Sequence, residues 1–194
     1  VWSDENRTRQ YVAIERALAI VQGRLGLIPR EAAAEIVSHC HIDRIDMARL
    51  REQTERIGYP ILGVVTQINQ LCRDKLGEYV HWGATTQDIM DTASVLQVRA
   101  ALELVEADLQ RVADNLVALT KAHRDTVMAG RTHLQHALPI TFGYKTAVWL
   151  SGIDRHLQRL AEIKPRVLVG EFGGAAGTLA SLGDNGLAVH DALM

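Results

Sequence analysis

Three polar segments that contain glycine hold the residues best suited to chemistry in this sequence. They are residues 81–88, 130–136 and 170–178, and each lies beside a stretch with the apolar spacing of a helix. Side chains at the ends of rigid helices can be held in a fixed geometry, which binding and catalysis both require. We therefore treat these segments as candidate parts of a functional site.

The first segment, His-Trp-Gly-Ala-Thr-Thr-Gln-Asp, precedes the longest helical pattern in the chain. The hydroxyls of Thr85 and Thr86, the unpaired N–H groups of a first helical turn and the positive end of the helix dipole together favour a carboxylate or phosphate ligand. A simpler interpretation is helix capping, in which Thr85 and Asp88 form a T-x-x-D capping box. The residues alone leave both interpretations open.

The second segment holds two histidines, His133 and His136, in an expected loop. Imidazole titrates close to neutral pH, so these side chains could act as acid and base. They could also bind a metal, but no cysteine or carboxylate nearby completes a ligand set. A solvated or purely structural role is a third interpretation.

The third segment, rich in glycine, follows the apolar residues 167–169 and resembles a strand with a nucleotide-binding loop. Its glycine spacing does not fit G-x-G-x-x-G, and no βαβ pattern surrounds it. We expect a kink or a close approach of two backbones here.

Composition argues against several classes of protein. The 194 residues include 21 Lys and Arg against 23 Asp and Glu, which gives a net charge of −2 and no electrostatic argument for nucleic acid or an anionic membrane as partner. The two cysteines, Cys40 and Cys72, cannot supply a disulfide framework, so a cytoplasmic location is expected. No apolar run approaches the roughly 20 residues of a membrane span.

The stretches between these segments have the apolar spacing of helices, which predicts an all-α fold. Short helices are expected over residues 3–25, 30–37, 46–57 and 60–74. Apolar residues then repeat at spacings of three and four from Val95 to Leu119, which predicts one long helix over about 88–123. A second long helix is expected over 139–164, with Pro139 in its first turn. Two such helices cannot cover both apolar seams by themselves, so further helices are expected to pack on them.

This pattern predicts two parts, a small helical head over residues 1–80 and the first part of a long-helix bundle over 81–194. The chain opens without Met, and its last residues are still apolar and helical in pattern. We therefore expect that the 194 residues belong to a longer protein and that the bundle is incomplete.

Six blocks of the sequence, taken in order, resemble the class II fumarase/aspartase superfamily. The blocks are WSDENR at 2–7, LGLIP at 25–29, YVHWGATTQD at 79–88, DT at 91–92, GRTHLQH at 130–136 and GGAAGT at 173–178. Each block is short, but together they run over nearly the whole chain. The likeness is to the branch that contains adenylosuccinate lyase and 3-carboxy-cis,cis-muconate cycloisomerase.

The resemblance implies an all-α homotetrameric enzyme with active sites where segments from three subunits meet, and no metal or organic cofactor is implied. Its reaction removes a proton next to a carboxylate and breaks a C–N or C–O bond at the β carbon of a small polycarboxylate. By position, the resemblance makes His133 the proton donor. The substrate-binding residues that it implies are His81, Thr85, Thr86, Thr132 and Gln135.

The sequence also departs from parts of this branch. Gly58-Tyr59-Pro60 stands where adenylosuccinate lyases usually have a His-Asp pair. The sequences of residues 132–143 and 172–183 are closer to those of the cycloisomerase. The family's Ser loop, expected to carry the general base, and its C-terminal domain do not occur among the 194 residues. The favoured function is 3-carboxymuconate-type cycloisomerisation in aromatic degradation. The alternatives are a C–N lyase of the adenylosuccinate type and a non-catalytic helical assembly module.

Overall fold

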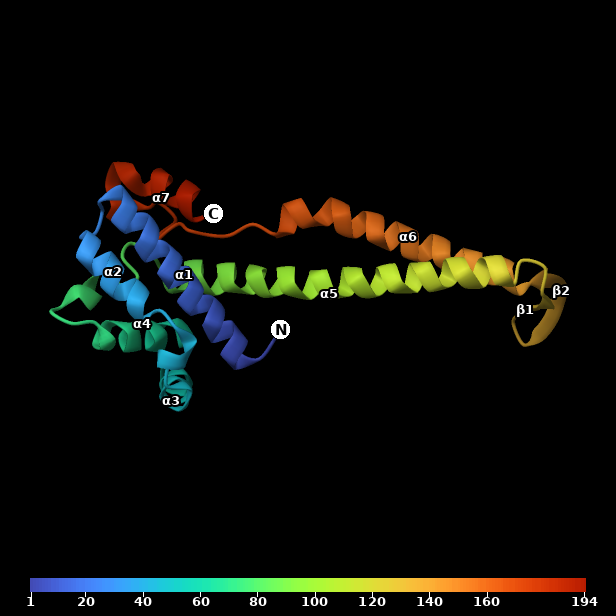
Figure 1. The fold of residues 1–194 in the computed structure, drawn as a ribbon, viewed down its shortest axis with the longest axis horizontal. Coiled ribbons are helices and arrows are strands. Elements are labelled where there is room, and N and C mark those ends of the chain that lie inside the picture. The colour runs from blue at the N-terminus through green and yellow to red at the C-terminus, as the bar shows by residue number, and fades with distance from the viewer. The chain divides into compact units, whose positions relative to one another are not determined.

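The computed structural model describes residues 1–194 and is helical almost throughout, which confirms the predicted all-α fold (Figure 1). The α-helices are α1 (Asp4–Leu25), α2 (Arg30–His39), α3 (Met47–Ile57), α4 (Pro60–Leu71), α5 (Thr86–Ala122), α6 (Phe142–Val167) and α7 (Gly186–Leu193). Short 3-10 helices lie at Ile42–Arg44, Leu76–Tyr79 and Ala180–Asn185. One two-stranded sheet, β1 (Val127–Thr132) and β2 (Gln135–Thr141), is the exception to the helical pattern.

The chain forms two compact units, which we describe separately. Unit 1 comprises Val1–Val98 and Leu168–Met194, and unit 2 comprises Arg99–Val167. Helix α5 runs from one unit into the other. These units are defined by contacts within the chain, so the predicted division of the parent protein at residue 80 stays a prediction.

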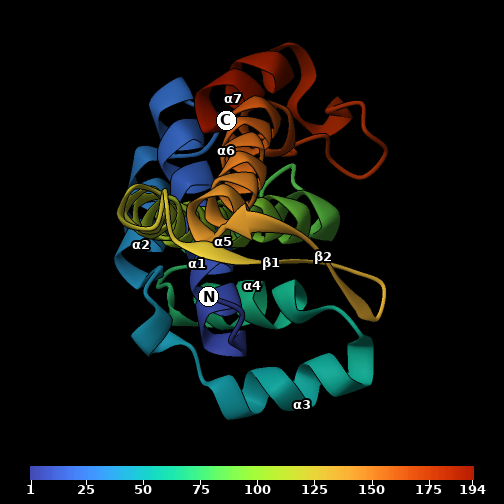
Figure 2. The same cartoon turned by 90° about the vertical axis from the view of Figure 1, so that its right-hand side faces the viewer.

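Unit 1 is built around α1, which packs against α2, α4 and α7. Figures 1 and 2 show α1 between α4 on one side and α7 on the other. Its main core is aliphatic and includes Ile36, Ile61, Ile68 and Ile89, all fully buried. Burying a side chain of this size stabilises a fold by about 1.5–3 kcal/mol, so the core fixes the relative positions of these helices.

Local hydrogen bonds and proline set the starts of these helices. Ser3 caps α1 by accepting a hydrogen bond from the Asn6 N–H at 3.2 Å, and Asp46 caps α3 through the N–H groups of Ala48 and Arg49. Pro60 occupies the first turn of α4, where its missing N–H leaves no partner unsatisfied. The head helices therefore follow directly from the sequence.

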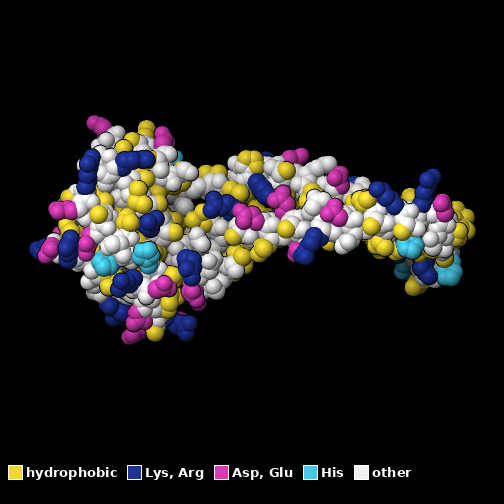
Figure 3. All heavy atoms as spheres, in the orientation of Figure 1, with side chains coloured by type: hydrophobic (Ala, Val, Ile, Leu, Met, Phe, Trp, Pro, Cys, Tyr) yellow, Lys and Arg dark blue, Asp and Glu magenta, His cyan; other side chains and the backbone are white.

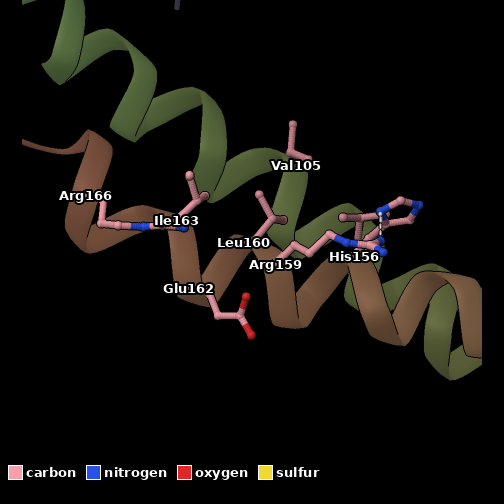
Figure 4. A pocket seen from close by; sticks show the side chains of 8 residues that line it. Val105, His156, Arg159, Leu160, Glu162, Ile163 and Arg166 are labelled. Carbon is pink, nitrogen blue, oxygen red and sulfur yellow. Dashed lines mark hydrogen bonds between the residues drawn. The ribbon is translucent and has the colours of Figure 1, made fainter.

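Unit 2 contains most of α5, the hairpin and α6. The helix predicted over 88–123 is confirmed as Thr86–Ala122, with 37 residues. Part of its apolar seam is buried, as at Leu116, while Val105 and Val112 are exposed within this chain. The two helices leave a groove of about 460 Å³, in which Leu160 and Ile163 on α6 point toward α5 (Figure 4). That further helices pack on this pair stays a prediction.

The prediction that a helix begins at Pro139 is wrong. Pro139 lies in β2, opposite Ala129 of β1, and α6 begins at Phe142. Proline lacks an N–H, but a two-stranded hairpin has two free edges and tolerates it. The cap of α6 comes from Thr141, whose hydroxyl accepts a hydrogen bond from the Tyr144 N–H at 3.1 Å. None of the helices is both long and apolar enough to cross a membrane.

Candidate functional site

The turn at residues 81–85 in unit 1 presents three of the predicted site residues together. His81 and Gly83 both adopt left-handed backbone conformations, with φ of 63° and 74°, and α5 begins at Thr86 immediately after the turn. His81, Thr85 and Thr86 are each partly exposed. The turn therefore brings an imidazole and two hydroxyls to the N-terminus of a 37-residue helix.

Asp88, in the first turn of α5, holds this turn against the glycine-rich segment. One carboxylate oxygen accepts hydrogen bonds from the N–H groups of Thr85 at 2.9 Å and Gly174 at 3.0 Å, and the other accepts one from the Gly173 N–H at 2.9 Å. The side chain is 1% exposed. Backbone N–H groups are good partners for a buried carboxylate, because each charge-assisted bond replaces a lost contact with water.

The capping interpretation is thus correct for Asp88, but it leaves two hydroxyls unused. The side chains of Thr85 and Thr86 form no hydrogen bond within the described residues 1–194. The first N–H groups of α5 also lack partners within the helix. Capping by Asp88 and ligand binding by Thr85 and Thr86 are therefore compatible.

The glycine-rich segment is a close approach of two backbones, as expected. Gly174 has φ of 72°, and a Cβ added there would stand 3.1 Å from the carbonyl oxygen of Gly83. A side chain at this position would be strained by the left-handed backbone and would press on the Gly83 carbonyl. Leu182 contributes to the same packing, because its side chain lies against Gly83 and belongs to a small core with Leu18 and Phe172.

Two buried polar side chains of α1 hold the turn from another direction. Glu15 Oε1 lies 2.5 Å from His81 Nδ1, and the Gln22 side-chain amide donates a hydrogen bond to the carbonyl of Trp82 at 2.7 Å. Glu15 is 1% exposed and Gln22 is fully buried. These residues were missed in the sequence, although their polarity within the apolar face of α1 was a usable signal.

The Glu15 carboxylate affects the charge of His81. Burial lowers the pKa of His81, but the hydrogen bond to Glu15 and the negative charges of Glu15 and Asp88 outweigh burial, so the net pKa is raised above its usual 6.5. Glu15 and Asp88 therefore favour the protonated, positively charged form of His81. A positive imidazole beside two hydroxyls and a helix N-terminus is suited to a carboxylate.

The other three predicted site residues lie on the hairpin of unit 2. Thr132 and Gln135 are paired across the end of the hairpin, and His133 lies in the turn between them. All three are exposed, as is His136 on β2. Figure 3 shows histidine side chains gathered on the surface at this hairpin. The chain thus presents its six predicted site residues as two groups of three, one group in each unit.

A family comparison agrees with this arrangement of helices and blocks. Residues 2–187 match the family model described as Lyase. The chain belongs to this lyase family. The trans-aconitate decarboxylase 1 of Mycosarcoma maydis is 55% identical over 100% of this chain and 39% of its own length. The adenylosuccinate lyase of Methanocaldococcus jannaschii is 40% identical over 98% of this chain and 41% of its own length.

A solved structure matches the fold closely. The 3-carboxy-cis,cis-muconate lactonizing enzyme of Pseudomonas putida is 42% identical and superposes with a TM-score of 0.96, covering 100% of this chain and 44% of that chain. The predicted membership in the branch of adenylosuccinate lyase and the cycloisomerase is confirmed. The lyase chain spans about two fifths of the length of the curated relatives it matches.

Replacing Asp88 with Asn tests the junction between the turn and the glycine-rich segment. An amide offers one acceptor oxygen instead of two, so at least one buried N–H loses its partner. We expect D88N to lower the free energy of unfolding by about 1–3 kcal/mol and to speed hydrogen exchange at Gly173 and Gly174. Urea denaturation and exchange measured by NMR or mass spectrometry check this.

The matched control is D114N on the same helix. Asp114 is exposed and accepts a bond from Gln110, so this change should leave both measurements near wild type. Equal exchange at the two glycines in D88N and D114N would contradict the role of Asp88.

Proposed function

We propose that the whole protein is an enzyme that transfers a proton next to a carboxylate of a small polycarboxylate, with addition or elimination at the β carbon. The observation that carries the proposal is the turn at 81–85. It presents His81, whose protonated form the contact with Glu15 favours, and the unused hydroxyls of Thr85 and Thr86 at the N-terminus of α5. Four features that each favour an anion converge on one place.

In this proposal, one substrate carboxylate binds to Thr85, Thr86 and the first turn of α5. His81 contacts the same carboxylate or its neighbour as a cation. Binding the carboxylate here also helps the chemistry, because removing or adding a proton at the adjacent carbon passes through a species with extra negative charge on that carboxylate. Positive groups already in place stabilise this charge without reorganising.

His133 is the proposed proton donor, and Thr132 and Gln135 contact the substrate beside it. Imidazole can hold a proton at neutral pH and release it in the reaction. An exposed hairpin is a suitable carrier for such a group, because it can enter a site formed on another subunit. We accordingly propose that the protein is a homotetramer whose sites combine the turn of one subunit with the hairpin of another.

The proposed substrate is an unsaturated tricarboxylate of the 3-carboxymuconate type. In the reaction, a carboxylate oxygen of the substrate forms a C–O bond to one carbon of a conjugated double bond, and a proton is delivered to the neighbouring carbon. The product is a lactone isomeric with the substrate, so no oxidant or reductant is required. Support comes from two similar proteins whose names specify trans-aconitate and 3-carboxy-cis,cis-muconate, because both compounds are unsaturated tricarboxylates.

A second candidate is elimination of the adenylosuccinate type, in which a C–N bond breaks at the β carbon. It is favoured by the 40% identity with an adenylosuccinate lyase. The two candidates require the same carboxylate site but differ in the group that leaves or adds. Side-by-side assays separate them.

We expect the whole protein to convert 3-carboxy-cis,cis-muconate to its lactone faster than it cleaves adenylosuccinate. Loss of the conjugated diene absorbance and identification of the product by NMR check the first reaction, and trans-aconitate serves as the other tricarboxylate. Turnover of adenylosuccinate alone would overturn the tricarboxylate proposal. Absence of turnover with all three compounds would favour the non-catalytic assembly module.

The proton-donor role predicts that H133Q lowers kcat by about 10²- to 10⁴-fold, the range typical of general acid–base groups. Glutamine keeps a polar side chain of similar length but cannot donate a proton at neutral pH. H136Q is the matched control, since His136 lies on the same hairpin and is also exposed. An unchanged kcat in H133Q, or an equal loss in both variants, would remove His133 from the mechanism.

A further inference from the structure

The Glu15–His81 pair lies behind the proposed carboxylate site and combines features that are unusual in a purely structural contact. Glu15 is on α1, and His81 lies 66 positions further along the chain. The two side chains meet at 2.5 Å, with Glu15 1% exposed. The His81 side chain is 15% exposed, so one part of the ring faces outward from the pair.

The second oxygen of Glu15 has no hydrogen-bond partner, although it is buried. A buried carboxylate with an unpartnered oxygen is costly unless a nearby positive charge compensates it. The groups that act on His81 are Glu15 from α1 and Asp88 from α5, and both are acidic. The nearby thiol of Cys40 is neutral, because burial and the charge of Glu15 raise its pKa to about 12. His81 is therefore the group that compensates Glu15.

The contact with Glu15 also determines which nitrogen of His81 remains available to bind a ligand. Nδ1–H donates to the Glu15 carboxylate, so the protonated ring keeps a second donor, Nε2–H, for another partner, whereas Nε2 of the neutral ring carries no proton. The backbone of His81 has φ of 63°, and the Gln22 amide holds the carbonyl of the next residue. An uncommon backbone conformation, held from two sides by buried polar groups, is typical of a residue kept in place for function.

We propose that Glu15 is a positioning residue for the site, which keeps His81 as a cation with Nε2–H directed toward a substrate carboxylate. This inference rests on the proposed function. It adds that the carboxylate site senses pH. Affinity for a polycarboxylate is retained below the pKa of His81 and is lost as the pH rises through that value. Glu15 extends this range upward, beyond the range of an ordinary histidine.

The test uses the whole protein as wild type and E15Q. The glutamine side chain can still accept the Nδ1–H bond, but it removes the charge. We expect the pKa of His81, followed by NMR of ¹³C-labelled histidine, to fall by about one to three pH units. The resonance is assigned by its absence in H81Q. Affinity for tricarballylate, a saturated tricarboxylate probe, should fall about 10-fold or more at slightly alkaline pH and recover as the pH is lowered.

The matched control is E35Q. Glu35 on α2 contacts His39 at 3.2 Å and is likewise a partly buried partner of a histidine in unit 1. E35Q should leave the titration of His81 and the binding of tricarballylate unchanged. In H81Q, tricarballylate should bind weakly with little dependence on pH across the same range.

Two failures can be told apart. An unchanged His81 pKa in E15Q, or a loss of affinity that does not recover at lower pH in a folded variant, overturns the positioning role. If wild type does not bind tricarballylate at all, the proposed carboxylate site is wrong. The titration of His81 still decides whether Glu15 controls its charge.

Discussion

The carboxylate of Asp88 is the constraint on which the rest of the candidate site depends. It joins the N–H group of Thr85 to those of Gly173 and Gly174, which lie more than 80 positions further along the chain. An ionised carboxylate only accepts hydrogen bonds and has two oxygens to do so, so three converging N–H donors match it better than they match an uncharged side chain. The end of α5 and the glycine-rich segment are thereby fixed to one another.

Because of this junction, the N-terminus of α5 is capped by Asp88 and still presents free hydroxyls that a ligand can bind. Asp88 lies on the buried side and satisfies the backbone there, while the hydroxyls of Thr85 and Thr86 stay unused. From the other side, α1 supplies Glu15 and Gln22 to the residues just before the helix. The turn is thus held by buried polar groups from two directions. A site held in this way loses little conformational entropy when a ligand binds.

The sequence predicted those parts of the fold that depend on neighbouring residues. Ser3, Asp46 and Pro60 mark helix starts through contacts within a few positions, and the seam from Val95 to Leu119 requires a long helix whatever covers it. The hairpin was missed, because its strands are mostly exposed and show no alternating burial. Pro139 is equally suited to a helix start and an edge strand, so it could not decide between them.

The sequence indicated which residues form the candidate site, but it did not indicate which residues they contact. Thr85 and Thr86 could be chosen because they lie at a helix N-terminus, and Asp88 could be identified as a cap, whereas His81 was implied only by the family resemblance. Its bonds to Gly173 and Gly174, and the contact between Glu15 and His81, join segments that are distant in sequence. Such pairs are set by the packing of α1 and the glycine-rich segment around α5, which no local pattern encodes.

Whether the N-terminus of α5 binds a substrate carboxylate can be seen in a crystal structure of the whole protein with an unreactive tricarboxylate. We expect one carboxylate within hydrogen-bond distance of the hydroxyls of Thr85 and Thr86 and of Nε2 of His81. A tricarboxylate bound elsewhere, with the hydroxyls of Thr85 and Thr86 in contact with water alone, would contradict it.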